Sequence, residues 1–367
     1  MNFNLVKNMT QLKLIPQITS SLIVTAATVL VLCVTSASAE TIDELYGKAK
    51  AEKELVLWGG GPAANYERAA RAFEKQYPGI KVMVEGGTSN VFSRKVEDQI
   101  KNKKIETDLL VLQTIQDFVN WKKRGLLLYF KPDGFDQVGR NSKDKDGAWI
   151  ATNAIPFFYV YNPDHVRPEQ VPKSALDFLK PEFKGKLITA YPSDDDAALY
   201  AFYTIVQKYG WRYMKQYMSQ QPKFVRGHLG VARAIASGEN LATFDSSMTA
   251  VVAAQRAGGK LAIVAPTDDA MPVFFNAEGI LKDAPHPNAA KLFVTWYLSK
   301  DWQGQTGIYS SRNDVSPPSG LKALSTYRLA NRYAQFVAKN EKELARLRKQ
   351  FEEYTGPIPQ SAGPTVR

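Results

Sequence analysis

Polar, glycine and aromatic residues lie at the ends of three short apolar runs, where they could bind a small solute. They are Trp58 and Gly60 at the first run, Ser89 and Asn90 after the second, and Gln113 and Thr114 after the third. Gly86 and Gly87 precede Ser89 and allow the backbone to be approached closely. If Ser89 or Asn90 begins a helix, the free N–H groups there favour an anion. The plainer alternative is that Ser89 only caps its own helix.

A second group of candidate residues lies later in the chain and carries both signs of charge. It comprises Ser193, Asp194, Arg226, His228, Asp245, Ser246 and Arg312. Arg226 precedes another expected helix, and Arg312 could clamp a carboxylate or phosphonate through two hydrogen bonds. The acidic stretch Ser193-Asp-Asp-Asp196 would repel an anion and suit an ammonium group or sugar hydroxyls, unless it only stabilises the start of a helix. A zwitterion or a hydroxylated acid would satisfy both sides.

Hydrophobic periodicity predicts the elements that position the first group. Apolar runs at 55–58, 80–84 and 108–112 predict buried strands, and helices are expected over about 66–77, 89–101 and 116–124. This repeated order of strand, loop and helix favours a parallel sheet covered by helices. In such sheets ligands bind beyond the carboxyl ends of the strands, which is where the first group falls.

A second α/β unit is expected around the later candidates. Strands are predicted near 155–161, 187–190, 241–244 and 273–276. One helix is expected from the three aspartates at 194–196 to about residue 208, and a second is expected to begin at 224–230. A mixed-charge helix is expected near 341–353. Asn288 is a candidate N-cap for a helix over about 287–296.

The first 39 residues have the three parts of a secretory signal peptide. Lys7 and Lys13 precede an apolar run over 22–34, and Ala37-Ser-Ala39 follows. Cleavage is expected after Ala39, with a retained anchor helix as the alternative. Cys33 is the only cysteine, so the mature chain would have neither disulfide, thiol chemistry nor a zinc–thiolate site.

The charge of the chain is basic, with a formal value of +11. Removing the two lysines of the signal peptide from the 47 basic residues would leave 45 against 36 acidic ones, a charge of +9. Because these residues are spread among acidic ones without a long basic run, we interpret the charge as a solvated surface and expect no nucleic-acid partner.

Four segments carry a resemblance to a known family. They are 70–82 (ARAFEKQYPGIKV), 123–126 (KRGL), 231–239 (VARAIASGE) and 283–303 (DAPHPNAAKLFVTWYLSKDWQ). With them, nearly the whole mature chain resembles the periplasmic solute-binding proteins of ABC importers, in particular the ferric-iron-binding-protein-like group. The resemblance implies the α/β two-lobed type II periplasmic-binding-protein fold, each lobe a mixed sheet flanked by helices, with the ligand in a cleft between the lobes. Its expected divisions are a signal peptide at 1–39, lobe 1 at 40–153 and 275–320, and lobe 2 at 154–274 and 321–367.

The resemblance also allows iron binding to be judged. Ferric members use a histidine, a glutamate and an adjacent tyrosine pair, and the matching positions fall near Pro62, at Gln113, and at about Asp245 and Ser246. None of these ligand types is retained, and hard ferric ion needs anionic oxygen donors. We therefore expect no metal and no cofactor. The same loops can line a site for an organic ligand, with Gln113 and Ser246 as hydrogen-bonding groups and Trp58 as an apolar wall.

A hydrolase on the same scaffold is the alternative from another class. The chain has no Gly-x-Ser-x-Gly elbow and no His-Glu-x-x-His pair, so no enzyme is expected. The resemblance implies a periplasmic receptor that captures a small polar organic solute for the permease and ATPase subunits of an ABC importer, and we expect a monomer. An organic acid, phosphonate or zwitterion is the leading ligand. A polyamine is the alternative, for which Asp194, Asp195, Asp196 and Asp245 would be the discriminating feature.

Overall fold

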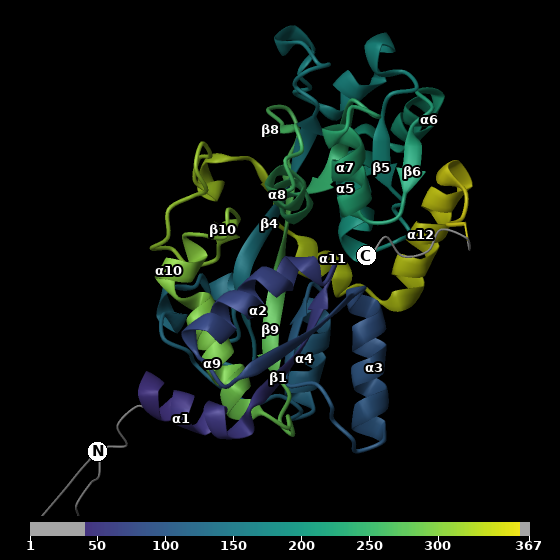
Figure 1. Ribbon diagram of the computed structural model, residues 1–367. Helices are drawn as coiled ribbons and strands as arrows, with labels where there is room; N and C mark the ends of the chain where they lie inside the picture. Colours follow the sequence, from purple (N-terminus) through teal and green to yellow (C-terminus); the bar gives the residue numbers. More distant parts are fainter. Residues whose placement is uncertain (1–40, 360–367) are drawn as a thin grey trace, which may run out of the picture. The chain divides into compact units, whose positions relative to one another are not determined.

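The computed structural model describes residues 41–359, so the predicted signal peptide and Cys33 lie outside the described residues. The chain forms a mixed α/β fold (Figure 1). Its helices are α1 Ile42–Glu52, α2 Ala64–Gln76, α3 Ser89–Lys101, α4 Ile115–Lys123, α5 Asp196–Tyr209, α6 Trp211–Ser219, α7 His228–Ala236, α8 Met248–Arg256, α9 Pro287–Leu298, α10 Lys300–Gln303, α11 Tyr333–Val337 and α12 Glu341–Thr355. Across residues 41–359, none of them has both the length and the apolar composition that a membrane crossing needs.

The strands are β1 Glu54–Gly60, β2 Lys81–Gly87, β3 Leu109–Leu112, β4 Ile150–Tyr161, β5 Ile188–Ala190, β6 Lys223–Val225, β7 Ala242–Ser247, β8 Ala262–Val264, β9 Met271–Ile280, β10 Tyr309–Ser310 and β11 Leu329–Ala330. Seven strands lie at predicted positions, β3 and β5 with shorter bounds and the other five with longer ones, whereas β6, β8, β10 and β11 are not predicted from the sequence. Nine strands form one sheet with the order β10-β4-β9-β3-β1-β2, to which β11, β7 and β8 attach, and β5 pairs with β6.

The parallel arrangement predicted for the first three strands is confirmed. Leu57 of β1 pairs with Val84 of β2 on one side and with Leu109 of β3 on the other, in parallel register. β9 then runs antiparallel to both β3 and β4, so the sheet as a whole is mixed. The carboxyl ends of β1, β2 and β3 therefore meet at one edge of the sheet, as the first group of candidates requires.

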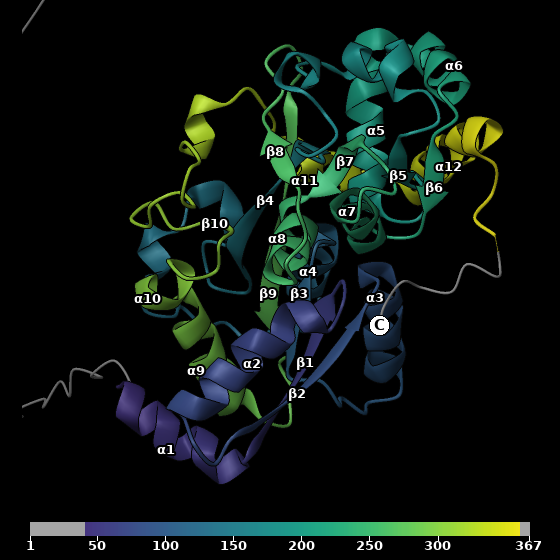
Figure 2. The same cartoon turned by 45° about the horizontal axis from the view of Figure 1, so that its top comes forward.

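β4 joins two halves of the chain because its pairing changes along its length. Its first part, from Ile150 to Pro156, pairs with β9, and its last part, from Phe157 to Tyr161, pairs with β7 and β8. All of β4 except its last residue is buried, which explains why its sequence is almost continuously apolar. Figures 1 and 2 show β4 and β9 running from one half into the other.

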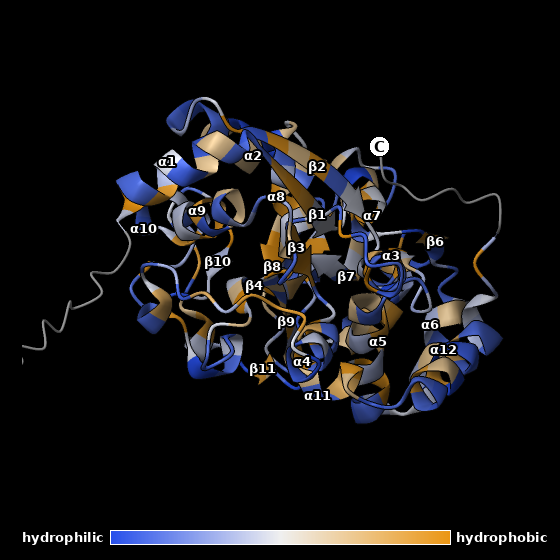
Figure 3. Ribbon diagram, turned by 90° about the horizontal axis from the view of Figure 1, so that it is seen from below, coloured by the Kyte–Doolittle hydropathy of each residue, from blue (hydrophilic) through white to orange (hydrophobic). Residues whose placement is uncertain are grey.

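Two large apolar cores lie on either side of this connection. The buried residues of the first come from 45–150 and 277–302, and include Phe73, Phe118 and Trp121. Those of the second come from 154–274, 309 and 333–351, and include Phe202 and Tyr213. Figure 3 shows apolar strands enclosed by helices that turn polar faces outward. The separate cores fit a two-lobed fold, while the lobe boundaries remain a prediction.

The predicted cap of α9 is wrong. His286 occupies the N-cap position and Pro287 the first helical position, so Asn288 already lies inside the helix. Proline is favoured at that first position because it lacks the N–H group that would have no partner there. The Asn288 side chain instead donates to Glu52 at 2.6 Å and ties α9 to α1.

Candidate functional site

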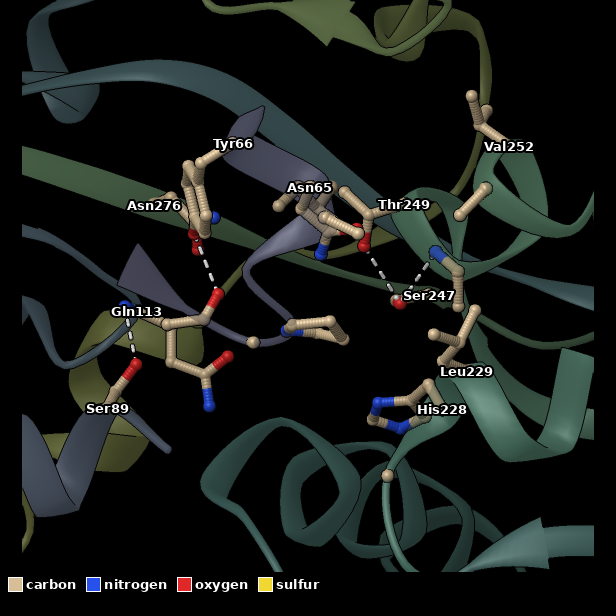
Figure 4. Close-up of a pocket in the computed structure, with 18 of the residues that line it drawn as sticks. Asn65, Tyr66, Ser89, Gln113, His228, Leu229, Ser247, Thr249, Val252 and Asn276 are labelled. Carbon is tan, nitrogen blue, oxygen red and sulfur yellow. Dashed lines mark hydrogen bonds between the residues drawn. The ribbon is translucent and has the colours of Figure 1, made fainter. Parts of the chain in front are cut away.

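A cavity of about 350 Å³ is lined by residues of both halves. One wall comes from the loops after β1, β2 and β3, and the other from the starts of α7 and α8 and the loop before α5. Figure 4 shows side chains of the two walls facing one another across it. Of the thirteen candidates named from the sequence, six line the cavity: Gly60, Ser89, Gln113, Asp194, Arg226 and His228.

Ser89 lies on the first wall at the start of α3. Thr88 is the N-cap of this helix and makes no side-chain capping bond, so the alternative that Ser89 caps the helix is wrong. Ser89 is 2% exposed, and its hydroxyl accepts a hydrogen bond from the Gln113 N–H at 3.3 Å. It thereby joins the loops after β2 and β3, and the Gln113 side chain extends into the cavity (Figure 4).

The paired glycines before Ser89 allow close packing of two chain segments. A Cβ atom at Gly86 would lie 2.1 Å from the backbone nitrogen of Ala63. The Gly61 N–H also donates to the Gly87 carbonyl at 2.6 Å, which holds the loop after β1 against β2. Because Gly61 and Pro62 of that loop line the cavity, the glycines shape its wall.

Several lining residues were missed by the sequence reasoning. Tyr66, which begins the helix expected over 66–77, is buried, yet it also lines the cavity and donates its hydroxyl to the Gly60 carbonyl at 2.7 Å. Asn65 and Asn276 bring amide groups to the same wall (Figure 4). Helical periodicity assigns a residue to a buried face, and it does not distinguish a core from a cavity wall.

The start of α8 forms part of the second wall. Ser247 caps this helix by accepting from the Ala250 N–H at 3.4 Å, and its hydroxyl lies 3.1 Å from that of Thr249 (Figure 4). Thr249 lines the cavity three residues after the candidate Ser246, which does not line it.

Arg226 and Asp194 neutralise one another on the second wall. Arg226 Nε donates to Asp194 Oδ1 at 2.9 Å, and Asp194 Oδ2 accepts from the Gly227 N–H at 2.9 Å. The cation that the sequence analysis assigns to an anionic ligand is therefore already paired with a carboxylate on the same wall. Asp195 also lines the cavity, and it caps α5 by accepting from the Ala198 N–H at 2.7 Å.

His228 is held beside Asp245, which lies behind the wall. The ring Nε2 is 3.1 Å from Asp245 Oδ1, and the other carboxylate oxygen accepts from Thr189 Oγ1 at 3.1 Å and from the Ala190 N–H at 3.2 Å. Burial opposes a charge on the imidazole, but the carboxylates of Asp245, Asp195 and Asp194 outweigh it and raise the pKa of His228 to about 9. The ring is therefore cationic at neutral pH. Burial, the largest effect on Asp195, raises the pKa of that carboxyl.

The other candidates lie away from the cavity surface. Trp58 stacks on Phe92, with ring centroids 5.3 Å apart, and so belongs to the core. Thr114 lies 3.3 Å from Ser93, and Arg312 binds Asp314 at 2.8 Å beside a second cavity of about 530 Å³. The remaining ones are the half-buried Asn90 and the buried Ser193 Oγ, Ser246 Oγ and Asp245.

The acidic stretch is divided between two environments. Asp194 and Asp195 line the cavity, whereas Asp196 is buried and accepts from Arg348 of α12 at 2.6 Å. No group of three or more histidine, cysteine, aspartate or glutamate side chains within residues 41–359 is arranged to hold a metal ion.

Two arginines that the sequence reasoning did not name lie at the exposed edge of the cavity. Arg68 comes from α2 and Arg256 from α8, one from each wall. Arg68 Nη2 donates to the Gln305 carbonyl at 3.2 Å, and Arg256 Nη2 donates to the Thr306 carbonyl at 2.7 Å. Both occupy exposed helical positions, which carry no sequence pattern that would mark them as part of a site.

Comparisons with known proteins agree with this geometry. The family model of the bacterial extracellular solute-binding proteins matches residues 68–325. The "Fe(3+)-binding periplasmic protein" of Serratia marcescens is 24% identical over 292 residues, which cover 77% of this chain and 83% of that protein. An uncharacterized protein of Haemophilus influenzae is 24% identical over 269 residues, which cover 70% of this chain and 76% of that protein.

Solved structures of periplasmic binding proteins have the same fold. The periplasmic binding protein AfuA from Actinobacillus pleuropneumoniae, with fructose-6-phosphate bound, is 20% identical with a TM-score of 0.67, and the match covers 82% of this chain and 98% of AfuA. Iron-bound HitA from Pseudomonas aeruginosa is 18% identical with a TM-score of 0.64, covering 81% and 99%. The chain therefore belongs to the bacterial extracellular solute-binding protein family, has its two-lobed type II fold, and is a solute-binding component of the kind that serves ABC importers.

Proposed function

We propose that this protein captures a small organic anion with further polar groups in the periplasm and delivers it to the permease of an ABC importer. The supporting observation is the cavity of about 350 Å³ between walls from both halves, onto which several helices direct their N-termini. The residues that begin α2 and α3 have no side-chain capping bond at their N-caps, Ala63 and Thr88. Such helix starts present backbone N–H groups and a partial positive charge to a ligand.

The polar groups of the walls favour an organic ligand over a bare ion. Gln113, Tyr66, Asn276 and Thr249 offer amide and hydroxyl groups, which suit hydroxyls and carboxylates. Asp194 and Asp195 on the second wall add acceptors for a hydroxyl or an amine of the same ligand. A hydroxylated acid, a phosphonate, a sugar phosphate or a zwitterion fits both walls, and the fructose-6-phosphate in AfuA supports this class.

Ferric ion fits these residues poorly. The resemblance puts the iron-ligand positions of the ferric group near Pro62 and at Gln113, which line the cavity, and at about Asp245 and Ser246, which are buried behind it. Asp245 already accepts hydrogen bonds from Thr189 and Ala190 and contacts His228. A hard cation needs several anionic oxygen donors that converge on it, and this wall does not supply them.

Binding requires no chemistry beyond closure of the two lobes. A ligand that contacts both walls only when they are close shifts the population towards the closed form. The proposed receptor therefore needs no catalytic group. Incubation of candidate ligands with the purified protein, followed by product analysis, checks this, and turnover would contradict it.

A thermal-shift screen of residues 40–367 tests the proposed ligand class. The panel contains citrate, alkyl phosphonates, fructose-6-phosphate, fructose, amino acids, spermidine and ferric citrate. A ligand at 100 times its dissociation constant stabilises the fold by about 2.7 kcal/mol, which is a measurable shift. Stabilisation by organic acids, phosphonates or phosphorylated sugars supports the proposal. Stabilisation by spermidine alone, or by ferric citrate but not citrate, would overturn it in favour of a polyamine or iron receptor.

A further inference from the structure

Arg68 and Arg256 bring two positive charges to the cavity from opposite walls. Arg68 projects from α2, near the loop after β1, and Arg256 is the last residue of α8. Both line the cavity. Each wall therefore contributes one guanidinium group to the same edge.

Neighbouring carbonyl groups hold the two side chains together. Arg68 donates to the carbonyl of Gln305 and Arg256 to that of Thr306, so one short segment after α10 positions both. The Arg68 guanidinium also lies 4.5 Å from the ring centroid of Trp302, which restricts its rotation. Each guanidinium has five N–H donors, so most of them are left for a ligand.

Arg68 and Arg256 differ from the two arginines expected to contact a ligand, Arg226 and Arg312, because within residues 41–359 neither of them is paired with an acid. Arg226 is paired with Asp194 and Arg312 with Asp314. By contrast, the hydrogen bonds of Arg68 and Arg256 within residues 41–359 go to backbone carbonyls, which carry no net charge. Partial burial and the charge of Arg256 both lower the pKa of Arg68, which indicates that the two cations influence one another.

We propose that Arg68 and Arg256 bind the phosphate, phosphonate or carboxylate group of the solute between them, and that this bridge draws the two lobes together. The inference rests on the proposed function and narrows it to ligands whose anionic group lies at the exposed edge of the cavity. Without a ligand, the like charges oppose approach of the walls. An anion between them reverses the sign of this interaction, so closure becomes conditional on a charged ligand. Hydroxyl or amine groups of the same ligand then face Asp194 and Asp195.

Calorimetric titration of arginine variants tests the bridge. The probes are fructose-6-phosphate, inorganic phosphate, methylphosphonate and citrate, with fructose as the uncharged comparison. Arg68→Gln and Arg256→Gln should each weaken binding of the anion that the wild-type protein binds by roughly tenfold to a hundredfold, because charge-assisted hydrogen bonds are lost. Arg346→Gln, at an exposed position of α12, removes the same charge far from the cavity and should change binding less than twofold.

The outcomes separate this inference from the proposed function. If the wild-type protein binds an anion and both glutamine variants bind it equally well, the arginine bridge is wrong while the proposed function stands. An equal loss in Arg346→Gln would also refute the bridge, because it would point to the overall charge. If the wild-type protein binds no anion of the series, the proposed function fails and the bridge falls with it.

Two further measurements keep the test decisive if a glutamine variant folds poorly. Arg68→Lys and Arg256→Lys keep the charge but lose the planar pair of donors, so an intermediate loss of affinity supports the bridge and a wild-type affinity contradicts it. Small-angle scattering of the wild-type protein should show compaction when the bound anion is added, and compaction of equal size with fructose would contradict conditional closure.

Discussion

The two walls of the cavity occupy similar places in the fold but differ in their electrostatics. Apart from Arg68, the first wall offers backbone, hydroxyl and amide groups from the loops after β1, β2 and β3, such as those of Ser89 and Gln113. The second wall instead has Asp194, Arg226 and His228. These side chains are charged, and they are bound to one another or to a buried acid. The same local structure, a strand that ends before a helix, thus positions side chains on both walls. The residue types at those positions decide whether a wall is neutral or charged.

The comparison predicts that the second wall contributes more to stability and to pH dependence than the first. A buried ion pair leaves an uncompensated charge when one partner is removed, whereas a neutral hydrogen bond leaves only an unsatisfied group. Four substitutions test this difference between the walls.

Asp245→Ala should have the largest effect. The substitution removes the acceptor for Thr189 and Ala190 and leaves the cationic His228 buried without its nearest carboxylate. We expect the free energy of unfolding to fall by roughly 3–5 kcal/mol, as measured by denaturant titration. The exposed Asp268→Ala is the matched control and should stay within about 0.5 kcal/mol. A loss below about 1 kcal/mol for Asp245→Ala would mean that this pair does not support the second wall.

His228→Gln should change how stability depends on pH. The folded-state pKa of His228, about 9, lies above its ordinary value of 6.5. Its stabilising contribution is therefore fully present below pH 6.5 and is lost as the pH rises through 9, with a total of at most about 3 kcal/mol. Unfolding between pH 6 and 10 should show a shallower decline for His228→Gln than for the wild-type protein. The exposed His165→Gln should leave the wild-type slope intact, and parallel slopes in all three proteins would contradict the prediction.

Gly86→Ala tests the backbone packing of the first wall. The added Cβ would lie 2.1 Å from the Ala63 nitrogen, so the loop after β1 must move. Overpacking of this kind costs about 1–3 kcal/mol. Gly47→Ala is the control, because no atom lies within 4 Å of the added Cβ inside α1, and it should stabilise the helix by about 0.5–1 kcal/mol. Thermal unfolding of both variants measures the difference, and equal stabilities would show that the loop adapts.

Ser89→Ala should have the smallest effect of the four. It removes the acceptor of the Gln113 N–H and leaves that half-buried donor unsatisfied, at about 1 kcal/mol. The same substitution should weaken ligand binding, because it loosens the loop that carries Gln113. Ser325→Ala, at an exposed position, serves as the reference for stability. A loss for Ser89→Ala as large as that for Asp245→Ala would remove the distinction between the walls.

The elements of the fold were largely predictable because their signals are local. The helix expected over 89–101 has those bounds, and the parallel pairing of β1 with β2 and β3 is confirmed. Glycine and proline mark the ends of these elements, and periodicity marks their buried faces. The antiparallel β9 and the division of β4 between two sets of partners depend on residues more than eighty positions apart, which no local pattern encodes.

The chemistry of the cavity was less predictable, because charge depends on contacts between distant residues. Arg226 is a residue type that binds anions, and only the fold shows that Asp194 lies beside it. Arg312 was likewise assigned to a ligand, and its guanidinium binds Asp314. Arg68 and Arg256, 188 positions apart in the chain, had no local signal and meet at one edge of the cavity.

The sequence by itself determined the α/β elements, the resemblance to solute-binding proteins and the loops in which the site would lie. These follow from periodicity and from turn residues, whose effects extend over a few positions. The tertiary structure alone decided which of the charged residues neutralise one another and which face the cavity. The physical reason is that electrostatic interaction depends on distance in space and on burial, and both are set only when the two halves of the chain pack.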